Sequence, residues 1–271
     1  MSPSPDPLAS LPGPVFSLGE ARAAGFRAAR VRRRGLAVPA RGVRRRRDAS
    51  PSSVAFAAAL ARRDRRLVVS HATAARAWGM WLPQALEDTV HVTRGAGGAW
   101  PRIAGVTGHS TQVPPEHVRT VTDATGTWRL TSPAWTWTDL AAVGMTVEEL
   151  VIAGDALLQR PVRPRPGDLA RHPLSHMDEL AELVAARGSI RGVRALRQAL
   201  PQLRGGVDSP QESRLRLGLV ASGWPEPEVN PEVPVLTTPD GRVLRHRKPD
   251  LAYRRVRLGL EPLDAPWLEE G

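Results

Sequence analysis

The stretch that decides the fold reads SPQESRLR at 209–216, KPDLAY at 248–253 and VRLGLE at 256–261. The first segment predicts a helix, because Ser209 is a favourable N-cap and Pro210 is tolerated at the first helical position. Gly223 can end this helix, since glycine accepts the left-handed conformation that is common just after a helix. The two later segments show the alternation of apolar residues that is typical of paired strands.

These later segments predict a hairpin that turns near Arg254-Arg255. A two-residue turn at that point would place Tyr253 opposite Val256 and Asp250 opposite Gly259. Because side chains alternate between the two faces of a strand, one face would carry Leu251, Tyr253, Val256, Leu258 and Leu260. The other face would carry Asp250, Ala252, Arg257, Gly259 and Glu261.

The second face of this hairpin carries two carboxylates, those of Asp250 and Glu261. On a diagonal across the hairpin their backbones would lie about 7–8 Å apart, within reach of one shared cation. Gly259, opposite Asp250, would leave room for a metal ion and a phosphate. Oxygen ligands with open coordination positions suit Mg²⁺, which polarises phosphate and activates water. The pattern therefore predicts a magnesium site.

At these residues the sequence resembles the endonuclease-domain proteins common in actinobacteria, which are relatives of very-short-patch-repair endonucleases within the PD-(D/E)XK restriction-endonuclease-like fold. The family pattern has a helical Glu in a Ser-Pro-x-Glu-Ser/Thr setting, then Pro-Asp-Leu-Ala, then a strand ending Glu-x-Asp-Gly with a His soon after. Glu212, Asp250 and Glu261 match its first three carboxylates. The resemblance implies that Asp250 and Glu261 hold Mg²⁺ and that Glu212 orients a metal-bound water or adds a ligand.

The sequence departs from this pattern directly after Glu261, where Pro262-Leu263-Asp264 replace the Asp-Gly and no His follows. We therefore expect a truncated nuclease domain that cuts DNA weakly or not at all, because transition-state contacts are missing. Lys248 or Arg257 could supply part of the missing positive charge.

Each of the three carboxylates also has a structural interpretation. Glu212 is the fourth residue of Ser209-x-x-Glu212 and can complete a capping box. Asp250 follows a proline and can be an exposed turn residue, whereas Glu261 can simply be the last residue of a strand that Pro262 ends. Their order along the chain and their shared hairpin face favour the nuclease interpretation.

The N-terminal segment concentrates positive charge, with eleven arginines between Arg22 and Arg47. Ser17-x-x-Glu20 predicts a capped short helix that Gly25 ends, and Phe26–Arg34 predicts a second, basic helix. A turn at Val38-Pro39 and a basic strand follow, which completes the order of a winged helix-turn-helix.

This segment also resembles the small winged-helix domain of AbiEi-type antitoxins. Its predicted DNA-binding residues are Arg30, Arg33, Arg34, Arg41, Arg44 and Arg45. The alternative is a solvated, arginine-rich helical pair that stabilises the next domain without contacting DNA.

The charge of the whole chain agrees with a polyanionic partner. Its 271 residues carry a net charge of +11 and a pI of about 11.4. Of its basic residues only Lys248 is a lysine, so coding bias in a GC-rich genome is the other explanation for the positive charge.

The absence of cysteine excludes disulfides and Cys-ligated zinc. No apolar run approaches the roughly 18 residues of a membrane span, and no signal peptide is recognisable, so we expect a cytoplasmic protein without membrane contact.

The pattern of elements predicts a mixed α+β protein of the broad α/β class. We expect a disordered segment at 1–14, a winged helix at 15–48, an α+β connecting domain at 49–160, a linker at 161–174 and the nuclease-like domain at 175–271. The linker prediction rests on three prolines between Pro161 and Pro166. The tryptophans of the connecting domain, which resembles that of the same family, are expected to pack in the core.

Two functions follow from these observations. The first is Mg²⁺-dependent cleavage of DNA, or a weakened descendant of that activity. The second is a non-catalytic DNA-binding regulator, antitoxin-like and with a possible toxin partner, that works through residues 17–47. A requirement for a divalent metal in DNA cutting would separate them, because a regulator binds without cutting.

Overall fold

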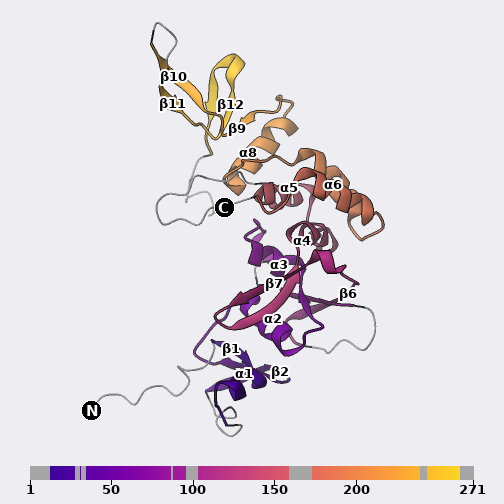
Figure 1. The fold of residues 1–271 in the computed structure, drawn as a ribbon. Helices are drawn as coiled ribbons and strands as arrows, with labels where there is room; N and C mark the ends of the chain where they lie inside the picture. The colour runs from indigo at the N-terminus through magenta and orange to yellow at the C-terminus, as the bar shows by residue number, and fades with distance from the viewer. Residues whose placement is uncertain are drawn as a thin grey trace, which may run out of the picture. The chain divides into compact units, whose positions relative to one another are not determined.

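The computed structural model describes residues 13–27, 31, 35–86, 88–95, 103–158, 173–238 and 243–262. The fold is mixed α+β, as predicted, and the chain forms two compact units, residues 1–143 and 144–271 (Figure 1). The division falls ahead of the linker predicted at 161–174, most of which lies outside the described residues. The helix after Thr146, placed in the predicted connecting domain, packs on helices of the second unit.

A three-stranded sheet begins the N-terminal unit, in the order β1-β3-β2. Its strands are β1 (Val15–Ser17), β2 (Leu36–Ala40) and β3 (Val43–Arg46), and α1 (Leu18–Ala23) follows β1 directly. The predicted capping box at the start of α1 is confirmed, because Ser17 and Glu20 exchange side-chain and backbone hydrogen bonds. The second basic helix lies largely outside the described residues.

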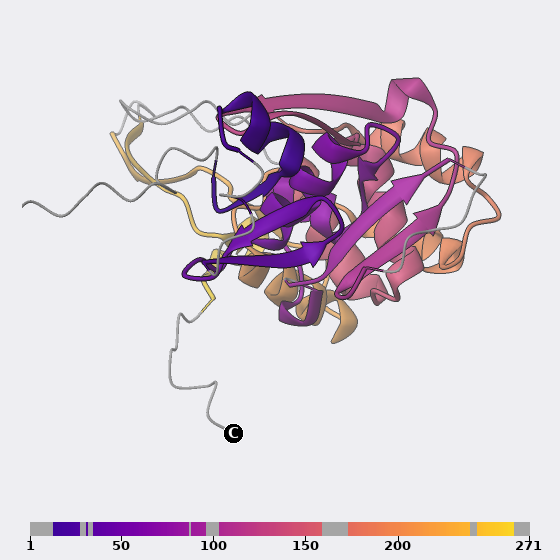
Figure 2. The ribbon, with the colours of Figure 1, turned by 90° about the horizontal axis from the view of Figure 1, so that it is seen from below.

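A mixed five-stranded sheet forms the body of the N-terminal unit, in the order β6-β5-β4-β8-β7 (Figures 1 and 2). Its strands are β4 (Val68–Val69), β5 (Val90–Arg94), β6 (Val106–Ser110), β7 (Val118–Asp123) and β8 (Gly126–Thr131). The β5–β6 and β4–β8 pairs are parallel, whereas β4–β5 and β7–β8 are antiparallel. Strand β6 therefore lies at one edge of the sheet.

Three helices complete this unit: α2 (Ser53–Arg63), α3 (His71–Trp78) and α4 (Pro133–Leu140). Short 3-10 turns cover Gln84–Leu86, Pro115–His117 and Ala141–Val143. The alanines of α2 pack on Val90, Val92 and Leu130 of the sheet, which leaves the alternate residues of β5 facing the other way. As predicted, the tryptophans at 128, 135 and 137 are buried.

The C-terminal unit begins with a helical layer made of α5 (Val147–Asp155), α6 (Met177–Ala186), α7 (Val193–Ala199) and α8 (Pro210–Ala221). Two 3-10 turns, Ala156–Leu158 and Leu200–Gln202, extend α5 and α7. Thr146 and Glu149 form a capping box at the start of α5. Helix α5 packs against both α7 and α8.

Two small sheets complete the unit. One is a hairpin of β10 (Val233–Thr237) and β11 (Val243–Arg247), and the other has the order β13-β12-β9. The second sheet contains β9 (Glu228–Val229), β12 (Leu251–Tyr253) and β13 (Leu258–Leu260). Within the described residues β13 lies at its edge. None of the helices in the described part of the chain combines the length and apolar character needed to cross a bilayer.

Candidate carboxylate site and adjoining basic cavity

Asp250 and Glu261 leave the β12–β13 ladder at the same end. The ladder pairs Leu251 with Leu260, Ala252 with Gly259 and Tyr253 with Leu258. The predicted two-residue turn is therefore wrong, because Arg254–Val256 form a 3-10 turn and Arg257 follows with φ of 53°. The longer connection shifts the register, so the next residues outward on the two strands are Asp250 and Glu261.

The predicted pairing of Gly259 with Asp250 is also wrong. Gly259 lies opposite Ala252, and a Cβ atom built on Gly259 would be 3.2 Å from Cβ of Pro249. The glycine therefore admits the proline that precedes Asp250. The close approach fixes the start of β12 against β13.

Glu212 stands in the first turn of α8 and is 5% exposed. Its backbone N–H donates to Oγ of Ser209 at 3.2 Å, as the capping prediction requires. Its carboxylate does not complete the box, however, because Oε2 accepts from the backbone N–H of Asp208 at 3.0 Å and from Nδ2 of Asn230 at 2.7 Å. These two donors hold the Glu212 carboxylate in one orientation.

Asn230 connects this carboxylate to the sheet. It has a positive φ of 46°, its backbone N–H donates to the carbonyl of Asp250 at 2.7 Å, and Nδ2 also donates to the carbonyl of Gly206 at 3.0 Å. One residue therefore touches both Glu212 and the backbone of Asp250. Sequence reasoning missed Asn230; its only local signal was an Asn at a strand end, a residue type that adopts a left-handed conformation more often than most.

The electrostatics of the site centre on Asp250. Burial raises the pKa of its carboxyl group, and the negative charges of Glu212, Glu261 and Asp208 raise it further. Lys248 opposes this rise in pKa, but its ammonium group pairs with Asp208 at 2.8 Å. Glu212 and Glu261 are thus both close enough to act on Asp250, and a neighbouring carboxylate absent from the prediction, Asp208, acts on it as well.

This repulsion predicts that Asp250→Asn raises the thermal unfolding temperature at pH 7 and low ionic strength in the presence of EDTA. A raised pKa means that the folded protein binds this proton more tightly than the unfolded chain does. The ionised carboxylate of Asp250 therefore destabilises the folded protein. This destabilisation is absent below the ordinary pKa of 3.8 and grows as the pH rises through the raised pKa of Asp250. Calorimetry at pH 7 and at acid pH should show a gain only at pH 7.

The matched control for this variant is Glu232→Gln, which neutralises an exposed carboxylate of the same unit. It should leave the unfolding temperature close to that of the unmodified protein at both pH values. A lower unfolding temperature for Asp250→Asn at pH 7 would mean that attraction, not repulsion, dominates at Asp250.

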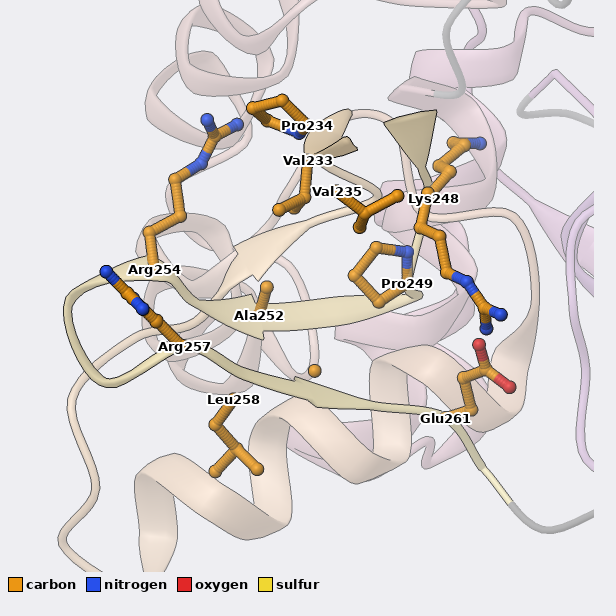
Figure 3. Close-up of a pocket in the computed structure, with 12 residues that line it drawn as sticks. Val233, Pro234, Val235, Lys248, Pro249, Ala252, Arg254, Arg257, Leu258 and Glu261 are labelled. Carbon is orange, nitrogen blue, oxygen red and sulfur yellow. The ribbon is translucent and has the colours of Figure 1, made fainter. Parts of the chain in front are cut away.

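A basic cavity adjoins this carboxylate group. It has a volume of about 940 Å³ and lies between the β10–β11 hairpin and the β12–β13 hairpin. Its charged lining residues are Arg247, Lys248, Arg254, Arg257 and Glu261. Figure 3 shows Arg254 and Arg257 at the end with the turn, and Lys248 and Glu261 at the opposite end of the strands. Glu261 belongs to both the cavity and the carboxylate group.

The predicted DNA-binding arginines of the N-terminal unit are dispersed. Arg30, Arg33 and Arg34 lie outside the described residues, and Arg41 is exposed at the β2–β3 turn. Arg44 pairs with Phe16 and Arg45 with Val15 across β1 and β3, so their side chains point to opposite faces of the sheet. The side chains of Arg44 and Arg45 therefore cannot both belong to one DNA-binding face of this sheet.

A group of three histidines, which sequence reasoning also missed, lies in the N-terminal unit. His71, His91 and His109 each offer a ring nitrogen, and these nitrogens lie within 4.8 Å of one another. It is the one cluster of three or more possible metal ligands among the described residues. Burial lowers the pKa of His91 to about 4, with a contribution from His109, and burial lowers the pKa of His109 as well.

No protein-family model matches this chain, and a search of curated proteins finds no match either. The resemblance described above therefore rests on the motif residues alone.

Proposed function

We propose that the C-terminal unit cleaves phosphodiester bonds of DNA in a metal-dependent reaction, at a site of the PD-(D/E)XK kind. The observation that carries this proposal is the effect of two carboxylates on a third. Glu212 of α8 and Glu261, at the end of one hairpin strand, both raise the pKa of Asp250, at the end of the other strand. Lys248 is the cation that acts on Asp250, and it is already paired with Asp208.

The donor type suits a hard divalent cation, but Glu212, Asp250 and Glu261 must move closer together to share one ion, because their ligand atoms do not all lie within 4.8 Å of one another. All are carboxylate oxygens, which Mg²⁺ and Mn²⁺ prefer. Asp250 and Glu261 would hold the ion at the end of the hairpin, and Glu212 would add a ligand or orient a water from α8. When bound, such an ion polarises a phosphate oxygen and lowers the pKa of a coordinated water.

The surrounding residues position these carboxylates. Asn230 and the backbone of Asp208 fix the Glu212 carboxylate, and the bond from Asn230 to the Asp250 carbonyl ties the helix end to β12. Preorganisation of this kind matters because displacements of about 1 Å can reduce a rate about 10²-fold. Asn230 is therefore proposed as a positioning residue.

The basic cavity supports a polyanionic substrate. Arg247, Lys248, Arg254 and Arg257 line it, and Glu261 lies at its edge. Arg254 pairs with Glu228 and Lys248 with Asp208, so these two cations must exchange their carboxylate partners to bind phosphates. Phosphate contacts position a duplex without reading its sequence. The proposed substrate is thus the DNA backbone, with the scissile phosphate at the end of the cavity near Glu261.

The direct test is cleavage of plasmid and linear DNA by the purified full-length protein with Mg²⁺, with Mn²⁺ and with EDTA. We expect slow cleavage that requires the divalent ion, because Pro262-Leu263-Asp264 stand where the resembled family has Asp-Gly. DNA binding without metal-dependent cutting would favour the second candidate, a non-catalytic regulator. That candidate is supported by the exposed Arg41 on the β2–β3 hairpin.

The salt dependence of DNA binding separates the two surfaces. Each phosphate contact contributes about −0.9 to the slope of log affinity against log salt concentration. Arg254→Ala combined with Arg257→Ala should make the slope shallower by about 2 if both arginines bind phosphates. Fluorescence anisotropy over a series of salt concentrations measures the change.

The matched control is Arg41→Ala combined with Arg44→Ala, which removes the same charge from the β2–β3 hairpin. An unchanged slope for this control together with a shallower slope for the cavity variant places DNA on the C-terminal unit. The reverse pattern would move the interface to the N-terminal hairpin and support the regulator.

A further inference from the structure

The three histidines lie on one face of the five-stranded sheet and on the helix that adjoins it. His91 is on β5 and His109 on β6, and the parallel register pairs His91 with Thr107 and His109 with Thr93. Residues two apart on a strand share a face, so both imidazoles lie on the same side of the sheet. His71 reaches them from the first position of α3.

The rings are in direct contact. The His71 and His109 rings stack with centroids 3.5 Å apart, and Nδ1 of His91 is 2.9 Å from Nε2 of His109. His71 and His91 are 4% and 5% exposed, and His109 is half-buried. Three nitrogen donors therefore converge in a space from which water is largely excluded.

Polar groups contact the His71 ring at its Nδ1 atom. Its Nδ1 atom is 2.9 Å from Oγ of Ser70 and 3.7 Å from the carboxylate of Asp139, which is itself 3% exposed. Thr93 donates to the same Ser70 oxygen at 2.7 Å. A hydroxyl or carboxylate on the outer nitrogen is the arrangement that orients metal-binding histidines.

The backbone at His71 is also unusual. Its φ of 51° is in the left-handed region, which is unfavourable for a residue other than glycine. Such conformations occur where the surroundings impose a particular side-chain direction. Here the conformation turns the imidazole of the first residue of α3 toward the two strand histidines.

We propose that His71, His91 and His109 form a binding site for a divalent transition metal, with zinc as the best-fitting ion. Three imidazoles without oxygen or sulfur ligands suit Zn²⁺ and its neighbours and not Mg²⁺. Nitrogens around a tetrahedral zinc lie roughly 3.4 Å apart, from Zn–N distances of about 2.0–2.1 Å, and the present spacing spans this value. Three protein ligands leave a fourth position for water.

Coordination requires one movement. Each imidazole lone pair lies in the plane of its ring, and the His71 and His109 rings are only 13° from parallel. They must tilt for their lone pairs to converge. His109 is the ring that can move, because it is half-buried and stands on β6, the edge strand of this sheet.

The test is a titration of the EDTA-treated, dialysed full-length protein with Co²⁺, followed by its visible absorption, and with Zn²⁺ against a chromophoric chelator. We expect one tightly bound ion per chain and an intense tetrahedral-type cobalt spectrum. His91→Gln and His109→Gln should each weaken binding by about 100-fold or more, and Asp139→Asn by about 10–100-fold, the range for outer-shell partners.

Two controls make the result specific. His246→Gln changes an exposed histidine of the other unit and should bind zinc as the unmodified protein does. Asp250→Asn disturbs the carboxylate site and should also leave zinc affinity unchanged, which separates this proposal from the proposed function. Circular dichroism in EDTA checks that the half-buried His109→Gln variant is folded. Absence of stoichiometric binding, or equal affinity in His109→Gln and His246→Gln, would overturn the proposal.

Discussion

Replacing Arg216 with alanine is expected to destabilise the C-terminal unit by about 3–5 kcal/mol, the usual cost of leaving a buried charge without its partner. The Arg216 side chain on α8 is 1% exposed and pairs with Asp155 of α5, whose side chain is fully buried, at 3.0 Å. Asp155 also accepts from Ser213 Oγ and from the backbone N–H of Arg204, both at 2.7 Å. The ion pair thus joins α5 and α8 inside the helical layer.

The pH dependence of this variant provides a second readout. Burial raises the pKa of Asp155, and Arg216 is the first of the groups that oppose the rise. Without Arg216 the folded protein should bind this proton still more tightly, so the loss of stability should be greatest near neutral pH and shrink as pH falls. Amide exchange of α5 and α8 at several pH values measures both effects.

Matched variants test the cause. Arg204→Ala removes a half-exposed arginine that pairs with Glu226 at 3.1 Å, and it should cost no more than about 1 kcal/mol. Asp155→Asn added to Arg216→Ala should recover part of the loss, because it removes the stranded charge. Equal, small effects of Arg216→Ala and Arg204→Ala would mean that water reaches Asp155 in solution.

Features determined by neighbouring residues were predictable from the sequence. The capping box at Ser17 forms as predicted, because it needs only one helical turn of chain. The capping box at Thr146 and the end of α3 at Gly79, which has a φ of 74°, are local features of the same kind. Buried positions on amphipathic helices, such as Leu180 and Leu196, also follow from periodicity alone.

The hairpin register was not predictable from composition. Its longer turn depends on Arg257 in the left-handed conformation, a position where glycine or asparagine would have given the signal. The predicted faces of Leu251, Tyr253, Leu258 and Leu260 remain correct because the register moved by an even number of residues. The predicted pairing of Gly259 with Asp250 does not remain, because Gly259 lies opposite Ala252.

Features that depend on the topology were missed entirely. His71, His91 and His109 are far apart in sequence, and only the parallel pairing of β5 with β6 brings two of them to one face. Asp155 did carry a usable signal, since an acidic residue between the apolar Ile152 and Leu157 must either be exposed or have a buried partner. Its partner on α8 could not be identified without the fold.

The domain division illustrates the same limit. Three prolines in 161–166 marked a plausible linker, yet α5, which precedes them, packs with the helices that follow. Composition locates a break in regular structure, whereas a domain boundary depends on which faces are buried together. The buried Asp155–Arg216 pair is the clearest physical reason that α5 belongs to the C-terminal unit.

Asp250→Asn is expected to reduce metal-dependent DNA cleavage by about 10²–10³-fold or more, the loss usual for one preorganised charge-stabilising contact. The negative charges of Glu212, Glu261 and Asp208 all raise the pKa of Asp250, so Asp250 lies at the centre of the negative charge. An amide of the same shape keeps the hairpin intact and removes one ligand charge. The Mn²⁺ concentration needed for half-maximal cleavage should rise in parallel.

Related variants assign the roles of the other residues. Glu261→Gln should behave as Asp250→Asn does, whereas Asn230→Ala should slow cleavage less and leave the Mn²⁺ requirement nearly unchanged, because it only orients Glu212. Glu232→Gln, an exposed carboxylate on the same unit, should cleave at the unmodified rate. Single-turnover cleavage of one defined duplex gives these rates without interference from product release. Full activity in Asp250→Asn would remove the hairpin carboxylates from the reaction and assign any cleavage to another part of the chain.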